Sequence, residues 1–419
     1  MKFSMIFEAQ MADTTRANER QVIRDCVEQA VLAEEVGYDA IWAVEHHSLK
    51  WYAHMSAPEV FLSFVAARTS RIRIGHGCVL LPFGFNPPVR VAERVAMLDV
   101  LSGGRLAVGA GRGATAQEMS LFGVRAEDTY AEVEEGLRML SRIWRGDDFE
   151  WHSDRLDFSP HPILPRPVQE PHPPLFMACT KRDTVALAAE LGVGALVLGF
   201  AGPVEVAALR AVYDEAIERR TGERLVSTEV NDHFAALCPT TVLDDPAEAL
   251  RLGARGQRFF AEAITHWYGG GPEPVHHVGE DDAVEMGRTA EGMVARLSEA
   301  NIPYTPSKTA VFNVEHAYGT AVDAIAYVER LVDAGADEIM CLIQMGTVPQ
   351  EACMETIRQW GATVIPHFRA SGAAGKVAAG PGSAAGVGAA GDGAAGVGAA
   401  AGNVPRIGPA LDSANVAGA

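Results

Sequence analysis

Short, uninterrupted apolar runs alternate with stretches of helical periodicity along the chain. Runs of this kind are typical of strands that are buried on both faces of a parallel sheet. Six of them fall within the first 200 residues, and two more lie further on. The predicted strands are residues 3–7, 40–44, 72–81, 105–111, 174–179, 195–200, 225–237 and 338–345.

Amphipathic segments connect these runs. In residues 20–37, Val22, Cys26 and Ala30 recur on one apolar face, and Gly37 provides a stop signal. Further helices are predicted at residues 87–104, 129–144, 322–337 and 354–368. Because strands and helices alternate, with no nucleotide-binding fingerprint in the first unit, the pattern favours an α/β fold of the (β/α)8, or TIM-barrel, type.

Two parts of the chain do not fit this alternation. Residues 240–318 follow the seventh strand and are more than a compact barrel needs for a connection, so a long insertion is expected there, with part of 265–310 mobile. Residues 371–419 are almost entirely Gly and Ala without periodicity, which predicts a disordered tail. The barrel domain is therefore predicted to be residues 1–370.

The composition argues against two classes of binding partner, nucleic acid and anionic lipid. Lys and Arg total 35 against 54 Asp and Glu, so the formal charge is 35 − 54 = −19. Such a protein repels nucleic acid and anionic lipid, and neither partner is expected. The six cysteines form no CxxC pair, which argues against a disulfide framework and a structural zinc site. We find no signal peptide and no span of about 18 apolar residues, and expect a cytoplasmic protein.

Three polar residues close the second predicted strand: Glu45, His46 and His47. Strand alternation places Glu45 and His47 on one side and His46 on the other, so they cannot bind one metal together, and no metal site is predicted. The carboxyl ends of barrel strands form the active site, so one or more of the three is expected to face it. The alternative is a polar strand end without a catalytic role. His276 and His277, in the insertion, are interpreted as solvated.

Two further segments carry candidate binding chemistry. Residues 108–114 match GxGxxA, but the acidic residue of a dinucleotide site is missing. The glycines then either admit a bound phosphate or ring, with Arg112 supplying charge, or only turn the chain. In residues 178–185 a strand ends and a helix begins, and free N–H groups near Thr180, Lys181 and Arg182 predict an anion site. An ordinary capped helix is the alternative.

Residues 33–47, 71–113 and 331–346 together resemble the bacterial luciferase-like flavin monooxygenases, with three separated blocks in the family's order and spacing. The natural-product pathway enzymes of that family are the most similar branch. The resemblance implies a TIM barrel, reduced FMN as a dissociable cosubstrate from a separate flavin reductase, and O2. It also implies a peroxyflavin, a hydrophobic substrate such as an aldehyde, ketone or polyketide-like intermediate, and a homodimer.

The resemblance also implies roles for particular residues. His46 falls on the family's histidine beside the flavin, needed for the peroxyflavin, and Glu45 is the adjoining candidate catalytic residue. The family's non-prolyl cis peptide falls on Gly77 and Cys78. The expected flavin contacts are Gly77, Cys78, Gly111, Arg112 as the phosphate ligand, Tyr130, Met177, Cys179, Thr180 and Lys181.

Two of these positions depart from the family's pattern. Gly111 stands where luciferases carry a reactive cysteine, so no thiol role is carried over. Tyr130 replaces a second phosphate-binding arginine, and Lys181 or Arg182 would have to compensate. Apolar residues that would line a substrate pocket, or serve as ordinary packing, are Trp51, Tyr52, Phe83, Phe85 and Met345.

Three alternative functions remain at the level of sequence. A deazaflavin-dependent reductase or dehydrogenase shares the barrel and transfers hydride without O2. A non-catalytic flavoprotein would sequester flavin, and loss of the strand-end histidine would mark it, but His46 is present. A flavin-independent barrel lyase or hydrolase would use Glu45 and His47.

Overall fold

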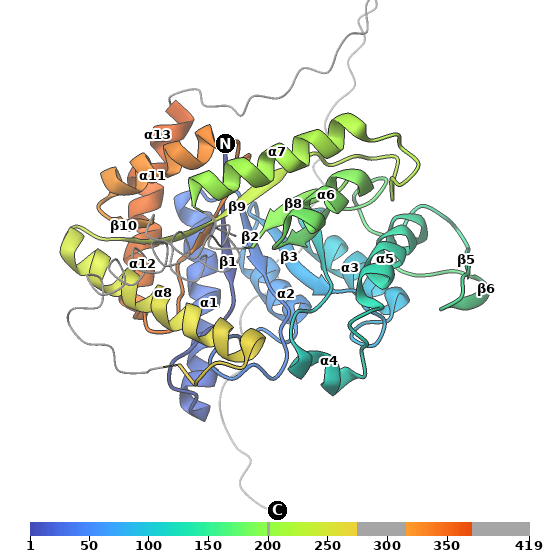
Figure 1. The fold of residues 1–419 in the computed structure, drawn as a ribbon, viewed down its shortest axis with the longest axis horizontal. Helices are drawn as coiled ribbons and strands as arrows, with labels where there is room; N and C mark the ends of the chain where they lie inside the picture. The colour runs from blue at the N-terminus through green and yellow to red at the C-terminus, as the bar shows by residue number, and fades with distance from the viewer. Residues whose placement is uncertain (199–201, 275–315, 371–419) are drawn as a thin grey trace, which may run out of the picture. The chain divides into compact units, whose positions relative to one another are not determined.

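Eight parallel strands close into a barrel with helices on its outer side (Figure 1). The computed structural model describes residues 1–198, 202–274 and 316–370. Closure follows from the pairing of β11 with β1 and of β8 with β9, so the predicted TIM barrel is confirmed. The barrel strands are β1 (Lys2–Phe7), β2 (Ala40–Ala43), β3 (Arg73–Leu80), β4 (Leu106–Gly111), β7 (Leu175–Cys179), β8 (Gly194–Val197), β9 (Phe234–Val242) and β11 (Glu338–Leu342).

Helices follow the strands as the periodicity predicts. The first one begins at an N-cap, where the Thr15 side chain accepts from the Asn18 N–H group, and ends at Gly37 with φ 99°. Only glycine adopts this left-handed conformation without cost, which explains the stop. The helices are α1 (Arg16–Val36), α2 (Pro58–Arg68), α3 (Pro88–Ser102), α4 (Ala116–Phe122), α5 (Thr129–Ile143), α6 (Arg182–Leu191), α7 (Pro203–Arg219), α8 (Pro246–Gly269), α11 (Ala321–Asp333), α12 (Gln350–Gln359) and α13 (Ile365–Ala370).

The predicted seventh strand was placed too early. Residues 225–233 lie outside β9, because side chains of this segment bond to neighbouring elements instead of a strand partner. The Oγ atom of Ser227 lies 2.6 Å from the Nε2 atom of His172, and the Asn231 amide donates to the Leu175 carbonyl. The strand then continues to Val242 with every residue buried. A hairpin of β5 (Phe149–His152) and β6 (Asp157–His161) was not predicted.

The predicted insertion contains parts of the barrel itself. Helix α8 occupies residues 246–269 and packs against β9, so it is the helix of the seventh βα unit. Strand β10 (Ala317–Gly319) then pairs with the last residues of β9. Residues 246–269 and 317–318 of the predicted insertion over 240–318 therefore form barrel elements. Its remaining residues, 275–315, and the predicted tail lie outside the described residues.

The last predicted helix is divided into three segments. A π-helix at Trp360–Val364 separates α12 from α13. The Trp360 side chain is fully buried, and its Nε1 atom donates to the Thr240 hydroxyl group at 3.1 Å. This contact fixes the closing helices against β9.

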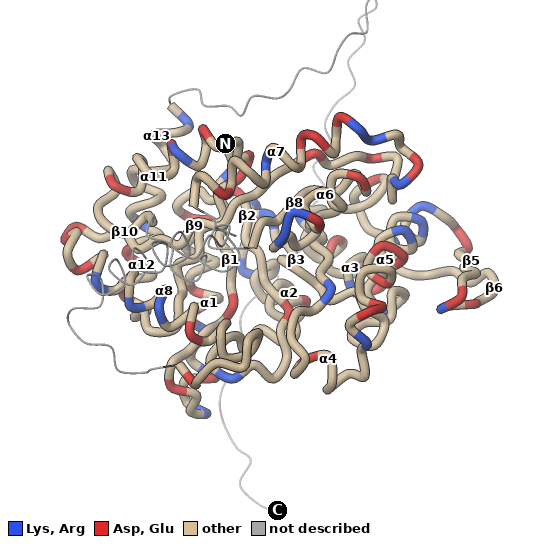
Figure 2. The backbone as a smooth tube through the Cα atoms, viewed as in Figure 1, with Lys and Arg blue, Asp and Glu red and all other residues tan. Residues whose placement is uncertain are grey.

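Charged residues lie mostly on the outer helices and loops (Figure 2). Glu338, at the start of β11, is a buried exception. Its carboxylate accepts from the Ser4 hydroxyl group at 2.5 Å and from the Trp42 indole N–H at 2.8 Å, and it contacts the Nε2 atom of His233 at 2.9 Å. Burial would raise the pKa of Glu338, but these contacts lower it on balance. The network therefore ties β1, β2 and β11 together inside the barrel.

Within the described residues, no helix is long and apolar enough to cross a membrane.

Candidate active site

The connections after β1 and β2 carry unusual backbone geometry. Ala9, Ser48 and Trp51 have φ angles of 52°, 58° and 69°, and they are the non-glycine residues with positive φ in the described part of the chain. This left-handed region is unfavourable for residues with a side chain, and such strain gathers at functional sites. Since both connections lie at the carboxyl end of the barrel, they mark the candidate site.

Glu118 of α4 holds His46 in a fixed orientation. The Nδ1 atom of His46 lies 2.9 Å from the Oε1 atom of Glu118. The same carboxylate accepts from the Thr115 hydroxyl group at 2.7 Å and from the His47 backbone N–H at 3.1 Å. With the Nδ1 atom occupied in this way, the other ring nitrogen, Nε2, lies 4.0 Å from the Oε2 atom of Glu8.

Glu118 is a functional residue that the sequence alone does not reveal. Thr115 and Glu118 have the spacing of a helix capping box, and the Thr115 side chain does accept from the Glu118 N–H group. That signal identifies the start of a helix. It does not show that the Glu118 carboxylate is directed at His46.

Charge reinforces the contact between His46 and Glu118. Burial would lower the pKa of His46, but the hydrogen bond and charge of Glu118, with smaller effects of Glu8 and Glu45, raise it on balance. Burial would raise the pKa of Glu118, but the contacts with His46 and Thr115 lower it. Both shifts favour an imidazolium paired with a carboxylate.

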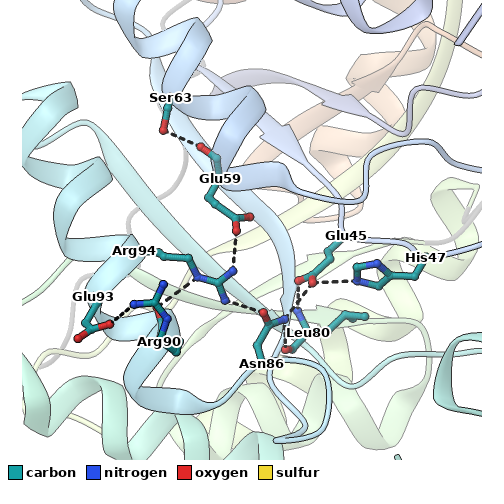
Figure 3. A network of polar contacts seen from close by, with 9 residues as sticks. All are labelled: Glu45, His47, Glu59, Ser63, Leu80, Asn86, Arg90, Glu93 and Arg94. Atoms are coloured by element: carbon teal, nitrogen blue, oxygen red, sulfur yellow. Dashed lines mark hydrogen bonds and ion pairs between the residues drawn. The ribbon is translucent and has the colours of Figure 1, made fainter. Parts of the chain in front are cut away.

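Glu45 joins the connection after β2 to the end of β3 and to the connection that follows β3 (Figure 3). Its carboxylate accepts from the Leu80 backbone N–H at 2.7 Å and from the Asn86 amide at 2.9 Å. The Nε2 atom of His47 lies 3.0 Å from the same carboxylate, so Glu45 and His47 lie on one side as predicted. Arg94 donates to Asn86 at 2.6 Å and extends the network. This geometry gives Glu45 a positioning role, and its predicted catalytic role stays a prediction.

The peptide bond between Gly77 and Cys78 is cis, as the resemblance implies. A Cβ atom on Gly111 would collide with the Sγ atom of Cys78, and one on Gly109 would collide with the His76 carbonyl oxygen. Because Gly109 and Gly111 have no side chains, strand β4 can pack closely against the neighbouring strand β3. This close packing was not among the uses predicted for them, and it accounts for both glycines without a bound phosphate.

The contact with Cys78 makes Gly111→Ala a direct test of this packing. We expect a loss of about 1–3 kcal/mol in the free energy of unfolding, because the added methyl group overpacks the β3–β4 interface. Urea denaturation measures the loss. Cys78→Ala removes the colliding sulfur atom, so the double variant is expected to recover most of it. Strictly additive effects of the two substitutions would contradict the direct collision.

Arg112 and Tyr130 come together at the end of β4. The guanidinium carbon of Arg112 lies 4.8 Å from the centroid of the Tyr130 ring, in a cation–π arrangement. Strand β4 pairs with β7, with Ala110 opposite Met177, so Arg112 lies at the same end of the barrel as the segment that follows β7.

The segment after β7 corrects one expectation. The backbone N–H groups of Thr180 and Lys181 donate to the hydroxyl group of Thr184, at 3.3 Å and 3.2 Å. The sequence predicts that these N–H groups are free to bind an anion, but in the structure they bond to a side chain in the first turn of α6. Thr180 and Lys181 are exposed at the site, whereas Cys179 and Met177 are buried in the strand. An anion here would rely on Arg112 and on side chains.

The residues predicted to line a pocket fall into different clusters. The Tyr52 ring lies 5.1 Å from the His46 ring and 5.4 Å from the Phe260 ring, whereas Trp51 contacts His266. Helix α8 therefore covers the His46 side of the barrel. Phe85 packs on Phe122 and His47, on the Glu45 side, and Met345 is fully buried near Tyr318. The substrate-binding role of these residues, including Phe83, stays a prediction.

Comparisons with known proteins agree with this geometry. Residues 1–338 match the model of the family described as luciferase-like monooxygenase. The oxygenase component of a flavin-dependent trigonelline monooxygenase from Acinetobacter baylyi is 25% identical over 83% of this chain and 90% of its own. A 4-hydroxyprotoasukamycin monooxygenase from Streptomyces nodosus subsp. asukaensis is 37% identical over 32% of this chain and 38% of its own.

A solved structure of the monooxygenase RslO1 from Streptomyces bottropensis has a similar fold, with a TM-score of 0.70 and 24% identity over 88% of this chain and 100% of its own. Enzymes named as dependent on F420, a deazaflavin, are also among the similar proteins. The family match is therefore compatible with FMN and with F420. The family match spans most of the chain and the named relatives are monooxygenases. The chain therefore belongs to the luciferase-like monooxygenase family, and it is an enzyme of the flavin-dependent monooxygenase type.

Proposed function

We propose that this enzyme uses reduced FMN, delivered by a separate flavin reductase, and O2 to oxygenate a hydrophobic organic substrate. An aldehyde, a ketone or a polyketide-like intermediate fits this description. The main structural support for this proposal is the His46–Glu118 pair at the mouth of the barrel, beside the cis peptide at Gly77 and Cys78. The relatives named as an oxygenase component and as a monooxygenase of protoasukamycin support the same class of reaction.

The side chains at the end of β4 fit the phosphate group of FMN. Among the described residues Arg112 packs on the Tyr130 ring and forms no ion pair with a carboxylate, which is notable in an acidic protein. A guanidinium group without a carboxylate partner is suited to a phosphate. Thr180 and Lys181 are exposed near the same strand end. Bound reduced FMN would supply two electrons that activate O2, the chemistry that the resemblance attributes to a peroxyflavin.

The protein's own contribution is to hold a proton and to exclude water. His46 is nearly buried, with a side-chain exposure of 13%, and Tyr52 and α8 cover it. A site of this kind excludes water, which would otherwise promote release of the activated oxygen as hydrogen peroxide before the substrate reacts. The imidazole, oriented by Glu118, holds a proton at the Nε2 atom for the reacting oxygen.

Anaerobic titration with reduced FMN and, in parallel, reduced F420 tests the cofactor. We expect FMN to bind and Arg112→Ala to raise the Kd for FMN by about tenfold or more, because the phosphate loses a charge-assisted hydrogen bond. Arg125→Ala is the matched control: Arg125 is an exposed arginine, paired with Asp128, and should leave the Kd unchanged. Binding of F420 alone would favour the reductase. Binding of neither would favour a flavin-independent enzyme.

We also propose that the protein is a homodimer. Neighbouring helices α2 and α3 expose apolar side chains that a monomer would leave in water. These are Val60, Phe64, Met97, Val100 and Leu101. A second copy of the chain can bury the same patch by two-fold symmetry.

Substituting this patch tests the dimer. Phe64→Glu combined with Leu101→Glu is expected to shift the protein from dimer to monomer in size-exclusion chromatography with light scattering, because two charges would be buried at the interface. Val204→Glu is the control, since Val204 is 75% exposed on α7, away from α2 and α3. A wild-type monomer, or a dimer that survives the double substitution, would contradict the proposal.

A further inference from the structure

Glu8 follows β1 directly, and its buried carboxyl group has one oxygen atom without a hydrogen bond in the described part of the chain. Its exposed fraction is 7%, and among the described residues its Oε2 atom has no hydrogen-bond partner. An unpaired buried carboxyl oxygen is costly and rare in folded proteins. The next residue, Ala9, has φ 52°, so the backbone at this point also departs from the ordinary regions.

The Oε2 atom of Glu8 lies 4.0 Å from the Nε2 atom of His46. On the other edge of the ring, Glu118 binds the Nδ1 atom at 2.9 Å. The imidazole is therefore flanked by two carboxyl groups, one in direct contact and one set back. A direct hydrogen bond needs about 2.7–3.2 Å, but an oxygen atom about 2.8 Å from both atoms would bridge a gap of 4.0 Å.

We propose that Glu8 is a positioning residue for His46, and that its carboxyl group and the Nε2 atom of His46 share one proton across a single bridging oxygen atom. The bridging atom belongs to water or to a substrate carbonyl or hydroxyl group. The assignment of the Nε2 edge to the reacting atoms rests on the proposed function. The sharing of the proton does not.

The proton transfer balances within the site. The N–H bond at the Nε2 atom of His46 breaks, the bridging oxygen takes that proton and gives up another, and an O–H bond forms at the carboxylate of Glu8. A neutral acid and a neutral imidazole result from a carboxylate and an imidazolium. The Nδ1–H group stays bonded to Glu118 throughout.

Burial brings the pKa of the Glu8 carboxyl group close to neutrality. Burial raises the pKa of Glu8 to about 7, with His46 opposing the shift and Glu118 adding to it. The titratable groups that face Glu8 are His46, Glu118 of α4, Tyr52, Tyr268 of α8 and Cys78 of β3. Below the pKa of Glu8 the group is neutral. Above it, the negative charge of Glu8 favours the protonated Nε2 atom of His46.

An NMR titration of the full chain without flavin tests the proposal. Histidine side chains are labelled with ¹⁵N, and the His46 signals are identified by their loss in His46→Gln. Between about pH 5 and pH 9 the Nε2 shift of His46 in the wild type is expected to show a step near the pKa of Glu8. Glu8→Gln is expected to abolish that step.

Glu205→Gln is the matched control. Burial alone raises the pKa of Glu205, on α7, also to about 7, so this variant should keep the step. Glu8→Asp retains a carboxyl group and should keep the step with a shifted midpoint, which guards against a misfolded glutamine variant. A wild-type curve without the step, or superimposable curves for the wild type and a folded Glu8→Gln, would overturn the proposal. Because no flavin is present, failure of the proposed function would instead appear as absent FMN binding alongside an intact step.

Discussion

His46→Ala is expected to abolish the protein's control over the reaction of reduced FMN with O2. In the wild type, the enclosed site should delay the release of hydrogen peroxide after a preformed complex with reduced FMN is mixed with oxygenated buffer. Without the imidazole, release is expected to be faster by about a hundredfold or more, the usual scale of a positioned proton-holding group. Stopped-flow absorbance of the flavin and a peroxide assay measure the two rates.

His47→Gln is the matched control for this experiment. His47 neighbours His46 in sequence, but its side chain contacts Glu45 rather than Glu118. We therefore expect the delay to change by less than about threefold, well below the hundredfold expected for the imidazole of His46. Equal effects of the two substitutions would show that disturbing this loop, and not the loss of one imidazole, is responsible.

Glu338→Ala is expected to cause the largest loss of stability. The substitution leaves the Trp42 indole, the Ser4 hydroxyl group and His233 without their common partner inside the barrel. Removing one member of a buried charged network costs about 3–5 kcal/mol in the free energy of unfolding. Urea denaturation at neutral pH measures this loss. Glu329→Ala, which removes an exposed carboxylate near His367, should cost less than about 1 kcal/mol.

The contribution of Glu338 also has a defined pH dependence. Its pKa is lower in the folded protein than in the unfolded chain, so its ionised form stabilises the fold. The full contribution is present above the unfolded pKa, about 4.3. It is lost as the pH falls through the lower pKa of the folded protein. The stability difference between the wild type and Glu338→Ala should therefore narrow in acid, and a constant difference down to the folded pKa would contradict this account.

Local pattern determined the architecture and one part of the site. Apolar runs and amphipathic helices are imposed by burial, which acts on each segment separately, so eight strands and the TIM barrel could be predicted from them. The placement of His46 at a strand end followed from the same alternation. The predicted boundaries differ from the structure where specific side-chain contacts determine them. Strand β9 begins later than predicted because Ser227 and Asn231 bond to other elements, and α8 lies within the predicted insertion.

Only the tertiary structure decided which groups meet. Glu8 follows β1, His46 follows β2 and Glu118 lies on α4, and no sequence spacing relates them. Closure of the barrel brings these strand ends together, and burial then shifts the pKa of each group. Likewise, Gly111 is required because Cys78 of the neighbouring strand fills the space beside it. The sequence alone therefore determined the scaffold and the catalytic histidine candidate. The proton-holding partners depend on contacts between distant segments, because electrostatic interaction falls with distance in space and not along the chain.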